Sequence, residues 1–255
     1  MARFTFGTGN LRKLLRVPLY ALGAVAAVLV PRSPRLWVFG SGIGVGEGAL
    51  PLYRAARERL GSDTRLIWLA SSAAELGDAR AQGLDAARKG SPRGFWLTLR
   101  AQVLVVTHGF GDVNRYATRG GFVVQLWHGI PLKRLHLDSP ATMRVSFLPN
   151  HRLVRGLVAR AYRRAGRGIS LFPVASELVA ARIQSAFGIP SDRIVVTGDP
   201  RDDVLTAPRD TPLLDADGAR TILYAPTWRD GAADPAAPTP DQWDAIAVWL
   251  EQNDA

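Results

Sequence analysis

The sequence predicts an α/β fold built on a parallel β-sheet, and two patterns carry this prediction. Beyond Arg35, short apolar runs alternate with stretches of helical periodicity, as expected when each strand is followed by a helix. Val103 to Val106 is a continuous apolar run of the length expected for a strand buried on both faces, which is typical of parallel sheets. A chain of 255 residues is long enough for one large domain or two small ones.

The first strand, Leu36 to Phe39, runs into a glycine-rich turn, Gly40 to Gly46, and a helix is expected from Ala49 to Leu60. The turn could face a phosphate or could be a tight strand-to-helix connection. Its glycines do not have the GxGxxG spacing of dinucleotide-binding proteins, which favours the second interpretation. The elements expected next are a strand over Thr64 to Leu69, a helix over Pro92 to Ala101, the Val103 to Val106 strand, and a strand over Phe122 to Leu126.

Two histidines come just after strands that are expected to lie close together in the sheet. His108 follows the Val103 to Val106 strand, and His128 follows the Phe122 to Leu126 strand. Ligands of open α/β sheets bind at the carboxyl ends of the strands. We therefore expect both imidazoles at the ligand-binding edge.

The second half begins with a basic amphipathic helix that carries arginines from Arg152 to Arg167. Its basic face is either a solvated helix surface or a binding surface for lipid headgroups or a polyanionic acceptor. A helix is then expected over Glu177 to Phe187, with Ser176 as its N-cap and Gly188 as its stop, followed by a strand over Arg193 to Val196.

Past Pro208 the sequence contains little apolar pattern. One strand is expected at Thr221 to Tyr224 and one helix near Asp241 to Glu251, separated by a Pro/Ala-rich linker over Gly231 to Pro240. So few apolar residues rarely form a core of their own. The favoured interpretation is an incomplete second α/β domain, and the alternative is a tail that packs on the first. The expected organisation is a membrane-proximal segment (1–34), a Rossmann-like domain (35–207) and the beginning of a second domain (208–255).

An apolar run from Val17 to Val30 is flanked by Arg12, Lys13 and Arg16 on one side and by Arg32 and Arg35 on the other. It is shorter than the roughly 20 residues of a membrane-spanning helix. A helix lying at the membrane interface is favoured, with a buried first helix and a secretory signal as the alternatives.

The composition narrows the possible partners and cofactors. The 32 basic and 22 acidic residues give a net charge of +10, which suits an anionic membrane surface, a phosphate-rich substrate or nucleic acid. Nucleic acid is disfavoured because no nucleic-acid-binding motif accompanies the charge. The absence of cysteine excludes disulfides and thiol catalysis, and the four histidines lack the spacing of a zinc site.

The segment Gln125 to Lys133, with the sequence QLWHGIPLK, combines a candidate base with a nearby cation. His128 could take a proton from a hydroxyl, and Lys133 could neutralise a phosphate. The glycine between them permits close backbone approach to a ligand. A structural histidine bonded to backbone is the alternative.

Three motifs together resemble the CDP-glycerol:poly(glycerophosphate) glycerophosphotransferase family. They are Gln125 to Lys133, the loop Thr197 to Asp203 (TGDPRDD), and Ile222 to Arg229 (ILYAPTWR), and they follow the family's order. The resemblance covers Arg35 to Asp230 and implies a GT-B-like fold of two Rossmann-like domains. It also implies transfer of glycerol phosphate, or a related polyol phosphate, from a CDP-activated donor to a teichoic-acid-like polymer or lipid-linked primer. CMP is released, no cofactor or metal is needed, and the enzyme is peripheral on the cytoplasmic face of the cell membrane.

By this resemblance His128 is the base that deprotonates the acceptor hydroxyl. Family members continue past the third motif with a second histidine and an acidic, serine-containing loop, and neither is found after Asp230. A catalytically silent, membrane-associated module that binds polyanionic polymer is therefore the alternative. For Arg201 and Arg229, arginines that brace the loops between domains are the alternative to phosphate binding. The residues expected to contact substrate are Lys133, Gly198, Pro200, Arg201, Thr227 and Arg229.

Overall fold

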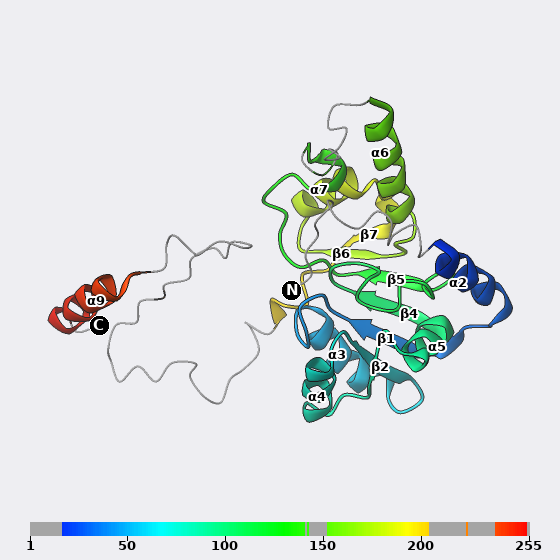
Figure 1. Ribbon diagram of the computed structural model, residues 1–255, viewed down its shortest axis with the longest axis horizontal. Coiled ribbons are helices and arrows are strands. Elements are labelled where there is room, and N and C mark those ends of the chain that lie inside the picture. The colour runs from blue at the N-terminus through cyan, green and yellow to red at the C-terminus, as the bar shows by residue number, and fades with distance from the viewer. Residues whose placement is uncertain (1–16, 141, 143–151, 204–222, 224–237, 254–255) are drawn as a thin grey trace. The chain divides into compact units, whose positions relative to one another are not determined.

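A computed structural model describes residues 17–140, 142, 152–203, 223 and 238–253 (Figure 1). The chain divides into two compact units, Met1–Ala207 and Pro208–Ala255, each of which is considered by itself. The strand expected at Thr221 to Tyr224 lies outside the described residues except for Leu223, which is exposed and belongs to no regular element.

The first unit is built on a five-stranded sheet in which all neighbouring strands are parallel. Its spatial order is β3-β2-β1-β4-β5, so the order reverses between β1 and β4. In α/β proteins, ligands bind at such a reversal, outside the carboxyl ends of the two strands. The α/β prediction is confirmed. The strands are β1 (Ser33–Gly40), β2 (Arg65–Ala70), β3 (Ala86–Arg88), β4 (Ala101–Val106) and β5 (Phe122–Gln125).

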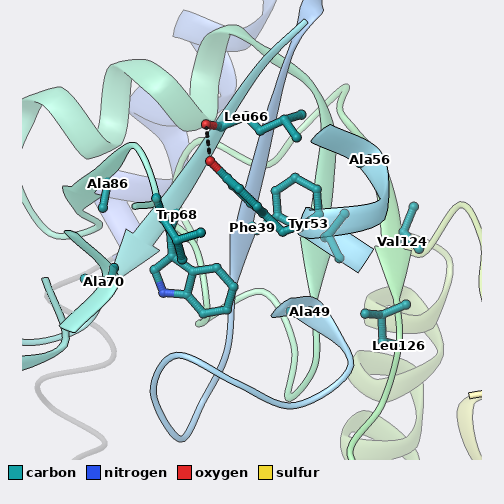
Figure 2. Packing of buried hydrophobic residues seen from close by; sticks show 13 residues of the cluster. Phe39, Ala49, Tyr53, Ala56, Leu66, Trp68, Ala70, Ala86, Val124 and Leu126 are labelled. Atoms are coloured by element: carbon teal, nitrogen blue, oxygen red, sulfur yellow. Dashed lines mark hydrogen bonds between the residues drawn. The ribbon is translucent and has the colours of Figure 1, made fainter. Parts of the chain in front are cut away.

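Side chains of the central strands alternate between two cores, as the pleat of a β-strand requires. Val38 packs in the core shared with helix α5 (Pro92–Arg100), whereas Phe39 packs in the core shared with helix α3 (Ala49–Leu60). Figure 2 shows the second core, where the hydroxyl of Tyr53 donates to the carbonyl of Leu66 at 3.1 Å. The observed bounds of α3 are those expected from the sequence.

Helix α4 (Ala73–Ala81) and strand β3 were not expected from the sequence. The helix begins at Ser72, whose hydroxyl accepts from the backbone N–H of Glu75 at 3.0 Å. The buried Glu75 carboxylate accepts from the indole N–H of Trp68 at 3.0 Å. A cap and a polar contact to the sheet therefore add to the core packing of Leu76 and Ala79 in fixing this helix.

A smaller parallel pair, β6 (Phe172–Val174) and β7 (Ile194–Val196), continues from the main sheet. The link to β5 is made by Leu171, whose carbonyl accepts from Gln125 N at 2.9 Å and whose N–H donates to Val123 O at 3.0 Å. Helices α6 (Arg152–Gly166) and α7 (Glu177–Phe187) complete this part (Figure 1), together with single-turn 3₁₀ helices at His136–Asp138 and Ser191–Arg193.

Helix α7 has the bounds and caps that the sequence predicts. The Ser176 hydroxyl accepts from Val179 N at 3.4 Å, and Gly188 closes the helix in the left-handed conformation, with φ of +63°.

Helix α2 (Val17–Leu29) packs against Tyr116 of the same unit. A Cβ on Gly23 would lie 1.9 Å from the carbonyl oxygen of Tyr116, and the ring of Tyr20 meets that of Tyr116 edge-on at 4.8 Å. Other apolar side chains of α2 remain in solvent, with Leu22 66% and Val28 76% exposed. Among the described residues, no helix combines the length and apolar character needed to cross a bilayer.

The arginines after α2 differ in their surroundings. The guanidinium of Arg32 donates to the carbonyls of Thr98, Ala101, Ala117 and Arg119, so it binds the protein's own backbone and not an external anion. Arg35 is exposed.

In the second unit the structure describes helix α9 (Pro240–Gln252), which agrees with the predicted last helix. Thr239 and Gln242 form a capping box at its start.

Candidate functional site

Three loops meet at the carboxyl edge of the sheet, at the point where the strand order reverses. They follow β1, β4 and β5 and carry Gly42, His108 and His128 respectively. The backbone N–H of Gly42 donates to Nδ1 of His108 at 3.3 Å, which joins the first two loops. The rings of His108 and His128 are stacked, with centroids 4.2 Å apart and planes 11° from parallel. The expected proximity of the two histidines is confirmed.

The His128 imidazole lies between two aromatic faces. Trp127 stacks on it with a centroid distance of 4.1 Å, while His108 stacks on it at 4.2 Å. Trp127 adopts a φ of +63°, a left-handed conformation that is unfavourable for a bulky side chain and that occurs mostly at functional sites. The Trp127 indole is held in turn by an edge-on contact with Phe187 of α7, at 5.0 Å.

These surroundings lower the pKa of His128 to about 4. Desolvation by the neighbouring rings is the largest cause, followed by the positive charge that His108 carries when protonated. The His128 residue is nevertheless exposed at the protein surface. Water screens part of the charge repulsion at this position.

The loop that carries His108 is organised by Asp112. One oxygen of this buried carboxylate accepts from the backbone N–H groups of Thr107, His108 and Gly109, at 2.9, 2.6 and 3.2 Å. Burial raises the pKa of Asp112, while these hydrogen bonds act in the opposite direction. The sequence analysis missed Asp112, although an aspartate closing a glycine-containing turn after a strand is a detectable signal.

A third histidine, His136, lies on the other side of Trp127. Its ring contacts Trp127 at 5.7 Å, Phe187 at 4.4 Å and Tyr162 at 5.1 Å, and burial lowers its pKa. Its buried Nδ1 has no hydrogen-bond partner among the described residues. The described part of the chain holds no group of three or more His, Asp or Glu side chains placed to share a metal ion.

The loop with Gly198, Pro200 and Arg201 lies beside the glycine-rich turn. The Arg201 guanidinium pairs with Asp199 at 2.7 Å and with Glu47 at 3.5 Å, and the hydrogen bond to Asp199 is the largest cause of its raised pKa. Two carboxylates thus balance this cation, and Arg201 braces the loop. Asp199 and Trp127 also line one small cavity of about 20 Å³, which places this loop next to the His128 turn.

Lys133 is exposed and lines a shallow cavity of about 170 Å³. Arg134 and Arg182 line the same cavity, and Asp138 is its one acidic lining residue. The Arg182 guanidinium donates to Pro131 O at 2.9 Å, and Asp138 accepts from Ser185. The cavity therefore has an excess of positive charge. Thr227 and Arg229, the remaining expected substrate contacts, lie outside the described residues.

The chain is similar to proteins of teichoic acid synthesis. Over 119 residues it is 31% identical to a teichoic acid glycerol-phosphate transferase of Staphylococcus aureus (strain NCTC 8325 / PS 47), a match that covers 43% of this chain and 29% of that protein. Two structures of the wall teichoic acid polymerase TagF share its fold. A histidine-to-alanine variant gives a TM-score of 0.66 at 19% identity, covering 98% of this chain and 64% of that one. A histidine-to-asparagine variant soaked with CDPG gives 0.57 at 19% identity, covering 76% and 48%.

These matches confirm the α/β, GT-B-like fold class. The chain spans less than a third of the curated relative and between about half and two thirds of the polymerase structures. The profile of CDP-glycerol:poly(glycerophosphate) glycerophosphotransferases matches residues 27–245. Because this match extends over most of its length, the chain belongs to the CDP-glycerol:poly(glycerophosphate) glycerophosphotransferase family.

Proposed function

We propose that the chain forms the acceptor-side part of a transferase that moves glycerol phosphate, or a related polyol phosphate, from a CDP-activated donor to a teichoic-acid-like acceptor. The observation that carries the proposal is the position of His128. It lies in the QLWHGIPLK segment of a family member and at the reversal point of a parallel sheet. Such a point is where α/β enzymes place their ligands.

In the proposed reaction His128 accepts the proton of the acceptor's terminal hydroxyl. The hydroxyl oxygen attacks the β-phosphorus of the donor, a new phosphate ester bond forms, and the bond to the α-phosphate oxygen breaks to release CMP. The low pKa of His128 keeps the imidazole neutral near pH 7, as a base requires.

Cations near this base would hold the phosphates of the two substrates. We assign the acceptor's phosphodiesters to the positive cavity lined by Lys133, because a polyanion gains most where several cations converge. Arg201 reaches the donor side after exchanging one of its carboxylate partners, while Gly198 and Pro200 shape its loop. Thr227 and Arg229 complete the proposed donor contacts.

We also propose that the protein is peripheral on the cytoplasmic face of the cell membrane. The apolar side chains that α2 leaves in solvent support this location, because burying them in the lipid interface removes them from water. Helix α6 adds exposed leucines and arginines, a composition that suits an anionic surface.

The test is CMP release from CDP-glycerol in the presence of a glycerol-phosphate-primed acceptor, using the longest reading frame that contains this chain. We expect His128→Ala to lose at least about 100-fold in kcat, because a general base contributes that much or more. His128→Gln, which keeps a polar side chain but cannot accept a proton at neutral pH, should be equally impaired.

Full activity of either variant would contradict the role of His128. Polymer binding without CMP release, unchanged by both substitutions, would instead identify a catalytically silent module that binds polyanionic polymer.

A further inference from the structure

The His108 imidazole is fixed independently of His128. The N–H of Gly42 can only donate, so Nδ1 of His108 is the acceptor in that bond, and the neutral ring carries its proton on Nε2. The Thr107 hydroxyl lies 2.8 Å from the same nitrogen, and Asp112 holds the backbone N–H of His108. Two contacts at Nδ1 therefore orient this ring, and a third fixes the backbone that carries it.

Gly42 is part of the same arrangement because the His108 ring occupies the space next to its α-carbon. A Cβ at position 42 would lie 2.5 Å from Cγ of His108, closer than real side chains approach. The glycine-rich turn after β1 is thus shaped to receive the His108 ring.

His128 is held differently. No hydrogen bond to another described residue orients its imidazole, which lies against Trp127 on one face and His108 on the other. Since His108 is anchored to the loops after β1 and β4, it transmits their positions to the histidine after β5. We propose that His108 is a positioning residue, which fixes the plane of the His128 imidazole and thereby the direction in which that base meets the acceptor hydroxyl.

The charges around His128 agree with this role. Within the described chain, the titratable groups that shift its pKa are His108, Arg201 and His136, and the carboxylates of Asp199 and Glu47 are paired with Arg201. All three are cations when protonated, and each opposes a second positive charge on His128. His108 makes the largest of these contributions, in line with its ring contact. The inference rests on the proposed function insofar as His128 is the base.

Nuclear magnetic resonance of the 255-residue chain with labelled histidines tests the inference directly, because the sequence has four histidines. We expect His108→Ala to move the titration midpoint of His128 upward by about one pH unit or more, since both desolvation and charge repulsion are lost. His108→Phe keeps a flat ring without the charge, so its midpoint should fall between those of the wild type and His108→Ala. His136→Phe, which removes a weaker repulsion, is the matched control.

If His108→Ala does not fold, Gly42→Ala provides a second route, because its Cβ displaces the ring while both histidines remain. We expect the His128 midpoint to rise in this variant too. A His128 titration curve unchanged in His108→Phe and in Gly42→Ala would overturn the inference.

Kinetics separate this inference from the proposed function. In the longest reading frame, His108→Phe should reduce kcat up to about 100-fold with little change in the KM of the acceptor, because the base is misplaced while the acceptor still binds. The acid limb of the pH–kcat profile should move upward with the His128 midpoint. If His128→Ala keeps its activity, His128 is not the base, although the effect of His108 on the His128 titration can still be present. If His128→Ala is inactive and His108→Phe is fully active, His128 remains the base and the positioning role of His108 is contradicted.

Discussion

At the residue scale, the low pKa of His128 keeps the imidazole neutral, which favours a base, but it also weakens the proton affinity that the base needs. A pKa of about 4 leaves the imidazole neutral, but it also makes the ring a weak proton acceptor. The charged groups that shift its pKa, His108, Arg201 and His136, all disfavour its protonated form. A polyanionic acceptor and a diphosphate donor bring the missing negative charge, so we expect the substrates themselves to strengthen the base.

This expectation gives a direct titration experiment. Addition of poly(glycerol phosphate) should raise the pKa of His128 toward its ordinary value, because nearby phosphates favour the protonated imidazole. The measurement is the His128 resonance followed over pH with and without polymer, and an uncharged polyol of similar length is the control. A midpoint unmoved by the phosphate polymer would show that the acceptor does not approach His128.

Asp112 offers a second prediction at this scale. Asp112→Asn replaces a carboxylate that accepts three backbone N–H groups, so we expect a loss of about 2 kcal/mol in the free energy of unfolding. Urea denaturation measures this loss, and Asp63→Asn, at an exposed turn position, is the matched control. Equal stability of the two variants would mean that the His108 loop does not depend on Asp112.

Single residues also mark the limit of sequence reasoning. Motif position and strand ends were enough to bring His108 and His128 together. The pairing of Arg201 with Glu47 was not foreseeable, because the two are 154 positions apart and a Coulomb contact leaves no local pattern. The requirement for glycine at position 42 was also not foreseeable, because it comes from the His108 ring, which follows a different strand.

At the scale of elements, α2 is an apolar helix that contacts the protein at Tyr116 and leaves several apolar side chains in solvent. Its small contact at Gly23 and the exposure of Leu22 and Val28 resemble an interfacial helix more than a core helix. The two arginines that follow it have different surroundings. Arg32 binds backbone carbonyls, whereas Arg35 is exposed.

Leu22→Glu should weaken binding to vesicles of anionic lipid about tenfold or more, because a leucine that enters the interface loses its transfer free energy and gains a charge. Co-sedimentation with the vesicles measures the change. Leu178→Glu is a suitable control, since Leu178 of α7 is 63% exposed, close to the 66% of Leu22. An equal effect of the two substitutions would argue against α2 as the membrane contact.

Elements with strong caps or continuous apolar runs could be predicted from the sequence, and those without them could not. Helix α7 follows from Ser176 and Gly188, and β4 follows from its apolar run. Helix α4 was not predicted because it has one large apolar residue, Leu76, and therefore no apolar stripe. The cap at Ser72 and the buried Glu75 support the packing of Leu76 and Ala79 on the core. Strand β3 has three residues, too few for a periodicity to show.

At the scale of the whole molecule, the net charge of +10 should make polymer binding strongly dependent on salt. Between 50 and 500 mM salt we expect the affinity for poly(glycerol phosphate) to fall by at least about tenfold, because screening weakens exposed charges first. Calorimetric titration at several salt concentrations checks this, with Lys133→Gln as a variant whose salt dependence should be shallower. Affinity independent of salt would indicate recognition through uncharged parts of the polymer.

The loop between β4 and β5 carries both His108 and Tyr116, the residue on which α2 is seated. His108 and Tyr116 are eight positions apart, so the two backbone positions lie within roughly 28 Å of each other. On the proposed membrane location of α2, this loop would set an upper limit on the distance between the bilayer and the proposed base. A lipid-anchored primer would then reach the base while it is still short, and a longer polymer would have to loop outward between its anchor and its growing end.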